Sequence, residues 1–448
     1  MTHFYDVIII GGGNAGFAVS SVVQEAGKSV AFIEARDFGG TCPNRGCTPK
    51  KVLVAAAHSR DEIARASAHG IHVDGAELDW SALIRREQAM VSFIPDAMKG
   101  VAEKRGDVYE GTARFVGRNA VEVNGERLEA GHIVIATGSK PRPLPIPGAE
   151  HLVTSDELLS DPTRPERVVF IGGGVIALEF GHVFLRAGSE VTILEAMPRL
   201  LPRLEADAVA VLREDTERLG ATVHTEVTVD AIEAVDGEFA VSYRLGDRTH
   251  VVRADRVVNG AGRVANVDTL DLDAAGIVHD GVRIDVDEHL RARSNPHVWV
   301  AGDALVYSAQ LSPLATYEGR IVGENIVAGP AESPDYRVIP SAVYTIPALA
   351  TVGLTEADAR AGGLRVRVST NDMREWFSGK SYAEPVAWAK VLIDEDTDQL
   401  LGAHLVGHRG EELIHTFSLA MQHGITATAL KNSMFAFPTF SSDIKNLL

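Results

Sequence analysis

One local pattern occurs twice in this chain and restricts its fold more than any other feature. Residues 7–34 begin VIIIGGGNAG, continue with a helical pattern and end in the apolar run FIE. Residues 168–195 begin VVFIGGGVIA, continue with a helical pattern and end in TILE. Each copy predicts a strand, a glycine-rich turn, a helix and a second strand that ends at an acidic residue, Glu34 or Glu195.

This repeated pattern is the arrangement that binds a dinucleotide. The first glycine permits a tight turn, the second lets the backbone approach a pyrophosphate, and the third position packs the helix on the strand. The start of the helix then offers N–H groups to the phosphates, and the acidic residue accepts hydrogen bonds from ribose hydroxyls. The candidate residues are Gly11, Gly13, Gly16 and Glu34 in the first copy and Gly172, Gly174, Ala177 and Glu195 in the second. Two copies predict two dinucleotides, most economically FAD and a nicotinamide nucleotide.

Composition and charge exclude several other classes of protein. The 448 residues carry a formal charge of −18, which argues against nucleic-acid and anionic-membrane partners. The apolar runs are shorter than the roughly 20 residues that a membrane helix needs. The N-terminal sequence has no basic region before its apolar run, so we expect no signal peptide. With only two cysteines a disulfide-stapled secreted scaffold is excluded, and we expect a protein of the reducing cytoplasm.

The two cysteines lie in the stretch GGTCPNRGCTPKK, residues 39–51. A zinc site would need about four ligands, and the sequence shows no second cluster of suitable spacing. Two buried structural thiols are the alternative. Thr48 as a cap and Pro49 as the first helical residue would place Cys47 beside a helix N-terminus, where the dipole stabilises a thiolate. Lys50 and Lys51 add positive charge, so the local pattern favours reactive thiols over structural ones.

This stretch resembles the active site of the class I flavoprotein disulfide reductases, which include glutathione reductase, dihydrolipoamide dehydrogenase, mycothione reductase and mercuric reductase. The resemblance covers nearly the whole chain, because further segments follow in the family's order. These segments are ATGS at 136–139, GRVAN at 262–266, AGD at 301–303, LSPLA at 311–315 and VGLTE at 352–356.

The resemblance implies a fold and a domain order. We expect an α/β chain with two Rossmann-like domains and a C-terminal α+β domain for dimerisation. The expected order is a first part of the FAD domain (1–150), an NAD(P) domain (151–258), a central part that completes the FAD domain (259–334) and the dimerisation domain (335–448). Residue patterns predict a helix at 202–219, strands at 239–244 and 250–258, and a proline-rich connector at 141–147. In the last domain they predict strands at 341–345, 388–393 and 401–406 and a helix at 411–423, with Trp376 and Phe377 packed inside.

The resemblance also implies roles for individual residues. Hydride would pass from the nicotinamide to FAD and on to the Cys42–Cys47 disulfide, with Cys42 attacking the substrate and Cys47 lying against the flavin. A lysine beside the flavin, Lys51 or less favourably Lys50, would pair with Glu179. The other residues implied are Thr41, Ala113, Thr137, Gly138, Asp303 and Ala315 for FAD and Gly262 for the nicotinamide nucleotide.

One residue bears on the choice of nicotinamide nucleotide. A carboxylate at Glu195 accepts a hydrogen bond from the adenosine 2′-hydroxyl and repels a 2′-phosphate. Arg199, close behind it, is a possible phosphate ligand. The sequence therefore favours NADH and leaves NADPH as the alternative.

The C-terminus departs from the family, whose members end in HPTxxE with a histidine that serves as general acid and base. Here Phe437 occupies the position of the histidine and Ser442 that of the glutamate. The rate enhancement that general acid-base catalysis supplies, typically 10²–10⁴-fold, is therefore missing or comes from another group. Asp443, His408, His415 and His423 are the other candidates for this role, and nothing in their spacing selects one.

Three functions remain open. The first is reduction of a low-molecular-weight disulfide, as in glutathione reductase, and the second is NADH-dependent reduction of a quinone, a metal ion or oxygen. The third is a flavoprotein scaffold or redox sensor. The substrate is weakly specified, because Ser21 replaces a glutathione-binding arginine, Arg320 matches a widely shared one, and the chain lacks the terminal cysteine pair of mercuric reductases. Arg45 either lowers a thiolate pKa, meets an anionic substrate or is a solvated loop residue.

Overall fold

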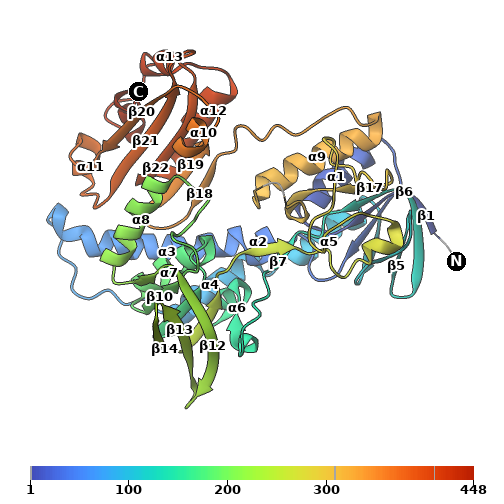
Figure 1. Ribbon diagram of the computed structural model, residues 1–448, viewed down its shortest axis with the longest axis horizontal. Helices are drawn as coiled ribbons and strands as arrows, with labels where there is room; N and C mark the ends of the chain where they lie inside the picture. The colour runs from blue at the N-terminus through green and yellow to red at the C-terminus, as the bar shows by residue number, and fades with distance from the viewer. Residues whose placement is uncertain (1–2, 307–308, 408) are drawn as a thin grey trace. The chain divides into compact units, whose positions relative to one another are not determined.

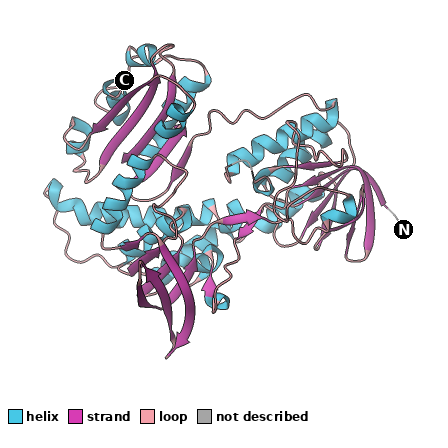
Figure 2. Ribbon diagram, viewed as in Figure 1, coloured by secondary structure: helices cyan, strands magenta, loops and turns pink. Residues whose placement is uncertain are grey.

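The computed structural model describes residues 3–306, 309–407 and 409–448 and divides the chain into two compact units. Unit 1 comprises the residues up to Lys50, Arg86–Arg142 and Arg263–Tyr336. Unit 2 comprises Lys51–Arg85, Pro143–Gly262 and Arg337–Leu448. Figure 1 follows the chain through both units, and Figure 2 shows that each mixes helices with sheets. Within the described residues, none of the helices has the length and apolar character needed to cross a membrane.

Unit 1 is built on a seven-stranded sheet. Its order is β3–β2–β1–β6–β5–β4, and β17 pairs with β6 outside this path. The pairs among β3, β2, β1, β6 and β17 are parallel, whereas β4 and β5 add an antiparallel edge. The strands are β1 (His3–Ile10), β2 (Val30–Glu34), β3 (Asp107–Glu110), β4 (Arg114–Gly117), β5 (Ala120–Val123), β6 (Glu126–Ile135) and β17 (Val298–Val300). A separate pair joins β7 (Ser139–Pro141) to β16 (Arg263–Ala265).

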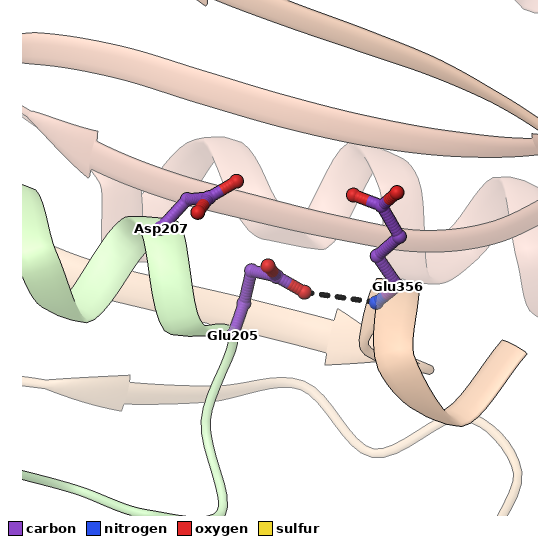
Figure 3. A group of neighbouring side chains, drawn as sticks. All are labelled: Glu205, Asp207 and Glu356. Atoms are coloured by element: carbon purple, nitrogen blue, oxygen red, sulfur yellow. Dashed lines mark hydrogen bonds between the residues drawn. The ribbon is translucent and has the colours of Figure 1, made fainter. Parts of the chain in front are cut away.

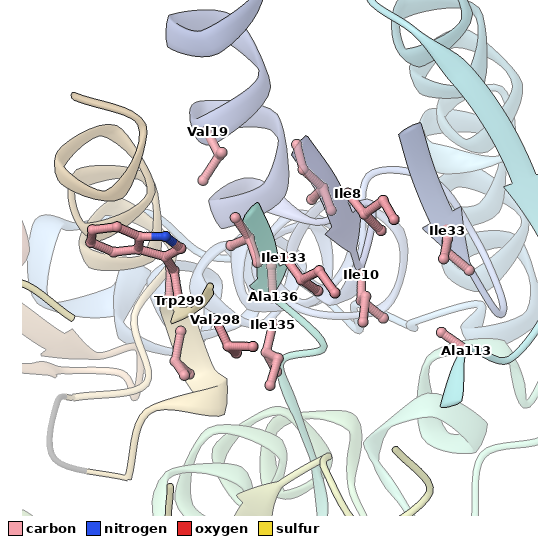
Figure 4. Close-up of a cluster of buried hydrophobic side chains, with 14 of the residues drawn as sticks. Ile8, Ile10, Val19, Ile33, Ala113, Ile133, Ile135, Ala136, Val298 and Trp299 are labelled. Carbon is pink, nitrogen blue, oxygen red and sulfur yellow. The ribbon is translucent and has the colours of Figure 1, made fainter. Parts of the chain in front are cut away.

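Helices cover this sheet and complete its core. They are α1 (Asn14–Glu25), α2 (Thr41–Arg45), α5 (Ile94–Glu103) and α9 (Ser312–Ala328), while α3 (Cys47–Arg65) and α4 (Trp80–Val91) each continue from one unit into the other. Figure 4 shows apolar side chains of β1, β2, β6 and β17 meeting beneath α1. Because both faces of a parallel sheet are covered, these strands are nearly continuous apolar runs, and Ile8, Ile133 and Trp299 are almost fully buried.

Unit 2 begins with a second parallel sheet, in the order β11–β10–β9–β15–β8. Its strands are β8 (Leu152–Val153), β9 (Arg167–Ile171), β10 (Glu190–Leu194), β11 (Thr222–His224) and β15 (Arg256–Asn259). The helices are α6 (Ser155–Ser160), α7 (Val175–Ala187) and α8 (Ala206–Arg218). A three-stranded antiparallel sheet packs beside it, made of β12 (Val227–Val235), β13 (Glu238–Leu245) and β14 (Arg248–Ala254).

The C-terminal part of unit 2 is an antiparallel sheet flanked by helices. The strand order is β18–β19–β22–β21–β20. The strands are β18 (Ser341–Val343), β19 (Ala348–Gly353), β20 (Val366–Asp372), β21 (Ala387–Asp394) and β22 (Leu400–Gly407). The helices are α10 (Glu356–Ala361), α11 (Phe377–Ser381), α12 (Gly410–Gln422), α13 (Ala427–Lys431) and α14 (Phe440–Asp443). The expected fold class, two Rossmann-like sheets and an α+β domain, is confirmed.

Several local expectations were wrong. The helix expected at 202–219 begins only at Ala206, and the strand expected at 250–258 is two strands, β14 and β15, in different sheets. Helix α3 begins at Cys47 itself, with the Lys50 N–H donating to the Gly46 carbonyl, so Cys47 lies in the first turn instead of before it. Strands β12, β19 and β20 were not expected. Trp376 is half-buried, but Phe377 is 65% exposed instead of packed inside.

A buried lysine joins α8 to the C-terminal sheet. The Lys390 ammonium on β21 lies 2.9 Å from Glu205, 2.7 Å from Asp207 and 2.5 Å from Glu356. Figure 3 shows these three carboxylates converging from the start of α8 and the start of α10. Burial disfavours the charge of Lys390, but its hydrogen bonds to the carboxylates outweigh burial and raise its pKa. The cluster therefore already holds a cation, the lysine ammonium.

We expect Lys390→Met to destabilise the protein, because it leaves carboxylates facing one another without their cation. Removing one partner of a buried ion pair costs about 3–5 kcal/mol. Thermal unfolding followed by circular dichroism measures this loss. Lys380→Met is the matched control, because Lys380 pairs with Glu375 at the surface, where such pairs contribute at most about 1 kcal/mol. Equal stability of the two variants would contradict the account.

Candidate active site

The first glycine turn, between β1 and α1, has no room for a side chain at Gly11, Gly12 or Gly16. Gly11 has φ +113°, and a Cβ there would lie 2.2 Å from the Ala136 carbonyl oxygen. A Cβ at Gly16 would lie 2.2 Å from the Gly11 carbonyl oxygen. The Gly12 N–H donates to Glu34 Oε2 at 2.7 Å, so the acidic residue that ends β2 fixes the turn. The cap of α1 is Gly13, so no side chain covers the helix N-terminus, which suits a phosphate group.

The second turn repeats the first in chemical detail. Gly172 has φ +102°, and a Cβ there would lie 2.4 Å from the Gly260 carbonyl carbon. The Gly173 N–H donates to Glu195 Oε2. Helix α7 begins after Gly174, and Ala177 is fully buried at the third motif position. Gly262 follows β15 with φ +92° and open space around it. Both turns therefore have the conformation that the sequence predicted for dinucleotide binding.

Unit 1 contains a buried polar atom that lacks a partner. The Thr137 hydroxyl is buried and has no hydrogen-bond partner among the described residues. It follows β6, beside Gly138, which has φ +67° and open space around it. Asp303 lies nearby, because Ser139 Oγ donates to Asp303 Oδ2 at 3.0 Å, and burial raises the pKa of Asp303. An unpaired hydroxyl and a buried carboxyl fit a bound polar molecule such as FAD. Of the other expected FAD residues, Ala113 and Ala315 are buried and Thr41 is exposed.

The two cysteines lie together at the junction of α2 and α3. Both are reduced, Cys42 half-buried and Cys47 exposed. A hydrogen bond from Cys47 lowers the pKa of Cys42 to about 6, burial opposes this effect, and a hydrogen bond from Ser312 adds to it. At neutral pH Cys42 is therefore mostly a thiolate, the form that attacks disulfides.

Ser312 is a site residue that sequence reasoning missed. It is the first residue of α9, and its Oγ accepts a hydrogen bond from Asn14 Nδ2 at the first residue of α1. Both residues lie in recognisable sequence motifs, the first glycine turn and LSPLA, but neither motif indicates that the two side chains meet. A polar residue at the first position of each of these helices was the available signal.

Arg45 is not a solvated loop residue. Its Nη1 donates to Asp37 Oδ2 at 2.6 Å, and its side chain is 15% exposed. The main influences on the pKa of Cys42 come from Cys47, burial and Ser312 instead of Arg45. Arg45 lines a cavity of about 180 Å³ together with Arg36 and Asn44. Of the three alternatives for Arg45, contact with an anionic substrate is the one that the geometry leaves open.

The lysine and glutamate expected beside the flavin approach a shared tyrosine in unit 2. Lys51 Nζ lies 4.1 Å from the centroid of the Tyr344 ring and 3.7 Å from Glu411 Oε1. Buried Glu179 accepts a hydrogen bond from the Tyr344 backbone N–H at 2.8 Å. Lys50 is half-buried. The roles of Lys51, Lys50 and Glu179 beside the flavin stay predictions.

The described residues of the C-terminal stretch do not select one of the candidates for the role of the missing histidine. Phe437 is 77% exposed. Ser442 is buried and its hydroxyl forms the cap of α14 with Thr439, so it cannot act as a carboxylate. Burial raises the pKa of Asp443, although a hydrogen bond from Ser378 opposes this. His415 and His423 are exposed, and His408 lies outside the described residues.

Comparison with known proteins agrees with this geometry. A family model described as pyridine nucleotide-disulphide oxidoreductase matches residues 5–319, and the dimerisation domain of that family matches residues 339–448. Dihydrolipoyl dehydrogenase of Chlamydia pneumoniae is 31% identical over 448 residues, which cover 98% of this chain and 95% of the relative. Glutathione reductase of Burkholderia cepacia is 30% identical over 446 residues, which cover 99% of this chain and 98% of the relative.

A solved structure is similar over the whole length. The Cu(II) complex of the HOCl-induced flavoprotein disulfide reductase RclA from Escherichia coli superimposes with a TM-score of 0.88 and 26% identity, covering 99% of both chains. The family uses FAD and a pyridine nucleotide, and the two glycine turns of this chain fit both groups. This chain belongs to the pyridine nucleotide-disulphide oxidoreductase family and is an FAD-dependent enzyme of that family.

Proposed function

We propose that this enzyme uses NADH to reduce a low-molecular-weight disulfide through Cys42 and Cys47. The observation that carries the proposal is the hydrogen-bonded cysteine pair, in which the pKa of Cys42 is lowered to about 6. The overall reaction converts NADH, a proton and one disulfide into NAD⁺ and two thiols. The FAD, when bound, supplies a carrier that accepts hydride from the nicotinamide and passes an electron pair to the Cys42–Cys47 disulfide.

The chain's own residues then carry out thiol–disulfide exchange. The Cys42 thiolate attacks one sulfur of the substrate, forms a mixed disulfide and releases the first thiolate. Cys47 attacks the Cys42 sulfur, which restores the Cys42–Cys47 disulfide and releases the second thiolate. Phe437 cannot donate protons to these leaving groups, so water supplies them. A low pKa at Cys42 makes the first attack possible without a histidine base.

The domain roles follow from the two glycine turns. We assign FAD to unit 1, with the residues named above around Gly11, Thr137 and Asp303, and the nicotinamide nucleotide to the turn at Gly172. The division at residues 150, 258 and 334 and the roles of Lys50, Lys51 and Glu179 belong to this proposal. A reducing compartment such as the cytoplasm fits a cysteine pair that must cycle between thiols and disulfide.

We further propose a homodimer formed through the C-terminal domain. This domain matches the family's dimerisation domain, and its loop between α13 and α14 exposes apolar side chains. Met434 is 99% exposed and Phe437 77% exposed. Large exposed apolar side chains close together are typical of a surface that a partner covers.

Reduction of a metal ion is the second candidate function. The similar solved structure is a Cu(II) complex of a flavoprotein disulfide reductase. Two cysteine thiolates can reduce two Cu²⁺ ions to Cu⁺ as the pair becomes a disulfide, and no leaving group then needs a proton. The absence of a histidine at Phe437 therefore would not slow this reaction.

The nicotinamide site supports NADH over NADPH. Glu195 is buried and accepts hydrogen bonds from the Gly173 and Met197 N–H groups. Arg199 donates to the carbonyl oxygens of Pro202 and Leu204, so its guanidinium is engaged within its own loop.

We therefore expect kcat/KM to be about tenfold or more higher for NADH than for NADPH. We expect Arg199→Leu to leave this ratio unchanged, because its guanidinium binds the loop instead of a phosphate. Steady-state kinetics with both nucleotides measures the ratio. A preference for NADPH, or a selective loss of activity with NADPH in Arg199→Leu, would show that the enzyme recognises the adenosine 2′-phosphate.

The reaction itself is tested by NADH oxidation under argon with a panel of acceptors: glutathione disulfide, lipoamide, cystine, a quinone and Cu(II). We expect turnover with at least one disulfide, and we expect Cys42→Ser to reduce that turnover to background while the flavin content stays the same. Phe437→His, on the surface that we propose the partner subunit covers, is expected to raise disulfide turnover about tenfold or more, since a general acid contributes typically 10²–10⁴-fold. Turnover with Cu(II) or the quinone and none with any disulfide would replace the first function with the second.

A further inference from the structure

The cavity of about 180 Å³ in unit 1 lies beside the short helix that carries Cys42. Its walls come from the loop after β2, from α2, and from the end of α4 with the turn that follows. A cavity of about 150 Å³ has room for a benzene ring, so this one has room for a carboxylate with several carbons. Its polar lining residues are Arg36, Asp37, Asn44, Arg45, Gln88 and Ser92.

Helix α2 brings the cavity close to Cys42. Arg45 follows Cys42 by three positions, and residues three apart in a helix lie on the same side, with Cβ atoms about 5–6 Å apart. Asn44 ties the helix to the preceding loop, because its Nδ2 donates to the carbonyl oxygens of Phe38 at 2.9 Å and Gly40 at 3.0 Å. Asn44 Oδ1 is buried and has no hydrogen-bond partner among the described residues. Buried polar atoms almost always have a partner, so this oxygen fits a site that a polar molecule completes.

The lining of the cavity is positively charged, although the chain as a whole carries a formal charge of −18. Arg45 Nη1 lies 2.6 Å from Asp37 Oδ2, and Arg36 Nε lies 3.5 Å from the same oxygen. Two arginines around one carboxylate leave one net positive charge in the cavity. Because the side chain of Arg45 is 15% exposed, water screens its charge less than that of a surface arginine.

We propose that this cavity binds a carboxylate of the substrate through Arg45, and that the substrate is therefore a low-molecular-weight disulfide that carries carboxylates. The inference rests on the proposed function, in which Cys42 attacks the substrate. The planar guanidinium of arginine matches a carboxylate in geometry as well as in charge. Arg36, whose side chain is 58% exposed, attracts the anion from solvent. A carboxylate held at Arg45 leaves the disulfide of the same molecule next to Cys42, one helical turn away.

The pyrophosphate of FAD is the other anion that we assign to unit 1. We place it at the first glycine turn, and among the described residues the lining of the cavity includes none from that turn. The two anions are also separable by experiment, since the loss of a residue that binds the pyrophosphate lowers the flavin content.

The test is a single attack by Cys42 on an anionic and on a neutral disulfide. All proteins carry Cys47→Ser, which leaves Cys42 as the only thiol of the chain. The flavin-loaded protein is mixed without oxygen with 5,5′-dithiobis(2-nitrobenzoate), which has two carboxylates, or with neutral 4,4′-dithiodipyridine. The Cys42 thiolate forms a mixed disulfide with one half of the reagent, the S–S bond of the reagent breaks, and the other half leaves as a thiol measured by its absorbance. Dividing the first rate by the second cancels the thiolate fraction of Cys42.

We expect this ratio to be higher for the Cys47→Ser protein than for the uncharged thiol 2-mercaptoethanol. Adding Arg45→Gln is expected to lower the ratio about tenfold, because hydrogen bonds between charged groups are the strong ones. Arg36→Gln is expected to lower it by a smaller factor. Asp37→Asn is expected to raise it, because the cavity then has no carboxylate to oppose the anion. Arg114→Gln is the matched control, since Arg114 pairs with Glu122 at the edge of the same sheet and should leave the ratio unchanged.

An unchanged ratio in Arg45→Gln would overturn the inference, and an unchanged ratio with a reduced flavin content would assign the cavity to FAD instead. If that variant fails to fold, as judged by thermal unfolding, Asp37→Asn decides, and a ratio that does not rise there overturns the inference equally. The measurement requires no turnover with NADH. A lowered ratio in Arg45→Gln supports the carboxylate site even if NADH reduces no disulfide, an outcome that would contradict only the proposed function.

Discussion

The turn between β1 and α1 leaves no space for a side chain at Gly11 or Gly12, and it brings the end of β6 and the start of α2 close to α1. Gly11 and Gly16 each lie so close to carbonyl oxygens that a Cβ at either would overlap them, and a Cβ at Gly40 would lie 2.8 Å from the Gly13 Cα. Gly40 directly precedes α2, so the same close contact places the cysteine-bearing helix beside the start of α1. The turn that leaves the N-terminus of α1 free of a side-chain cap thereby also places the helix that carries Cys42.

In the proposed function, the lowered pKa of Cys42 lets this cysteine attack a disulfide although the chain lacks the histidine of its family. Ionisation of Cys42 prepares the attacking sulfur, but it does not protonate a departing thiolate. The two tasks that a histidine base and acid would combine are therefore separated here. An acceptor whose reduced form needs no proton, or a thiol with a low pKa, suits such a site best.

Sequence reasoning succeeded where the physical requirement is local. The tight turns at Gly11 and Gly172 were predictable because each needs a positive φ that glycine adopts readily, and the same short motif contains Glu34 and Glu195. A helix beside the cysteine pair was predictable from Thr48 and Pro49, although it begins at Cys47 itself. Pairings between residues that are distant in sequence were not predicted: Ser312 with Asn14, and Glu205, Asp207 and Glu356 with Lys390. Such pairings depend on how strands and helices pack, which neither hydrophobic periodicity nor motif spacing encodes. The division of residues 250–258 between two sheets was missed for the same reason.

Anaerobic titration of the oxidised, flavin-loaded protein with NADH tests the central claim most directly. If electrons pass from NADH through the flavin to Cys42 and Cys47, each subunit takes up about two hydride equivalents, one for the flavin and one for the disulfide. Both cysteines then become accessible to a thiol reagent. Uptake of about one equivalent, with both cysteines still resistant to the reagent after the flavin is reduced, would contradict the account. The pair would then take no part in electron transfer.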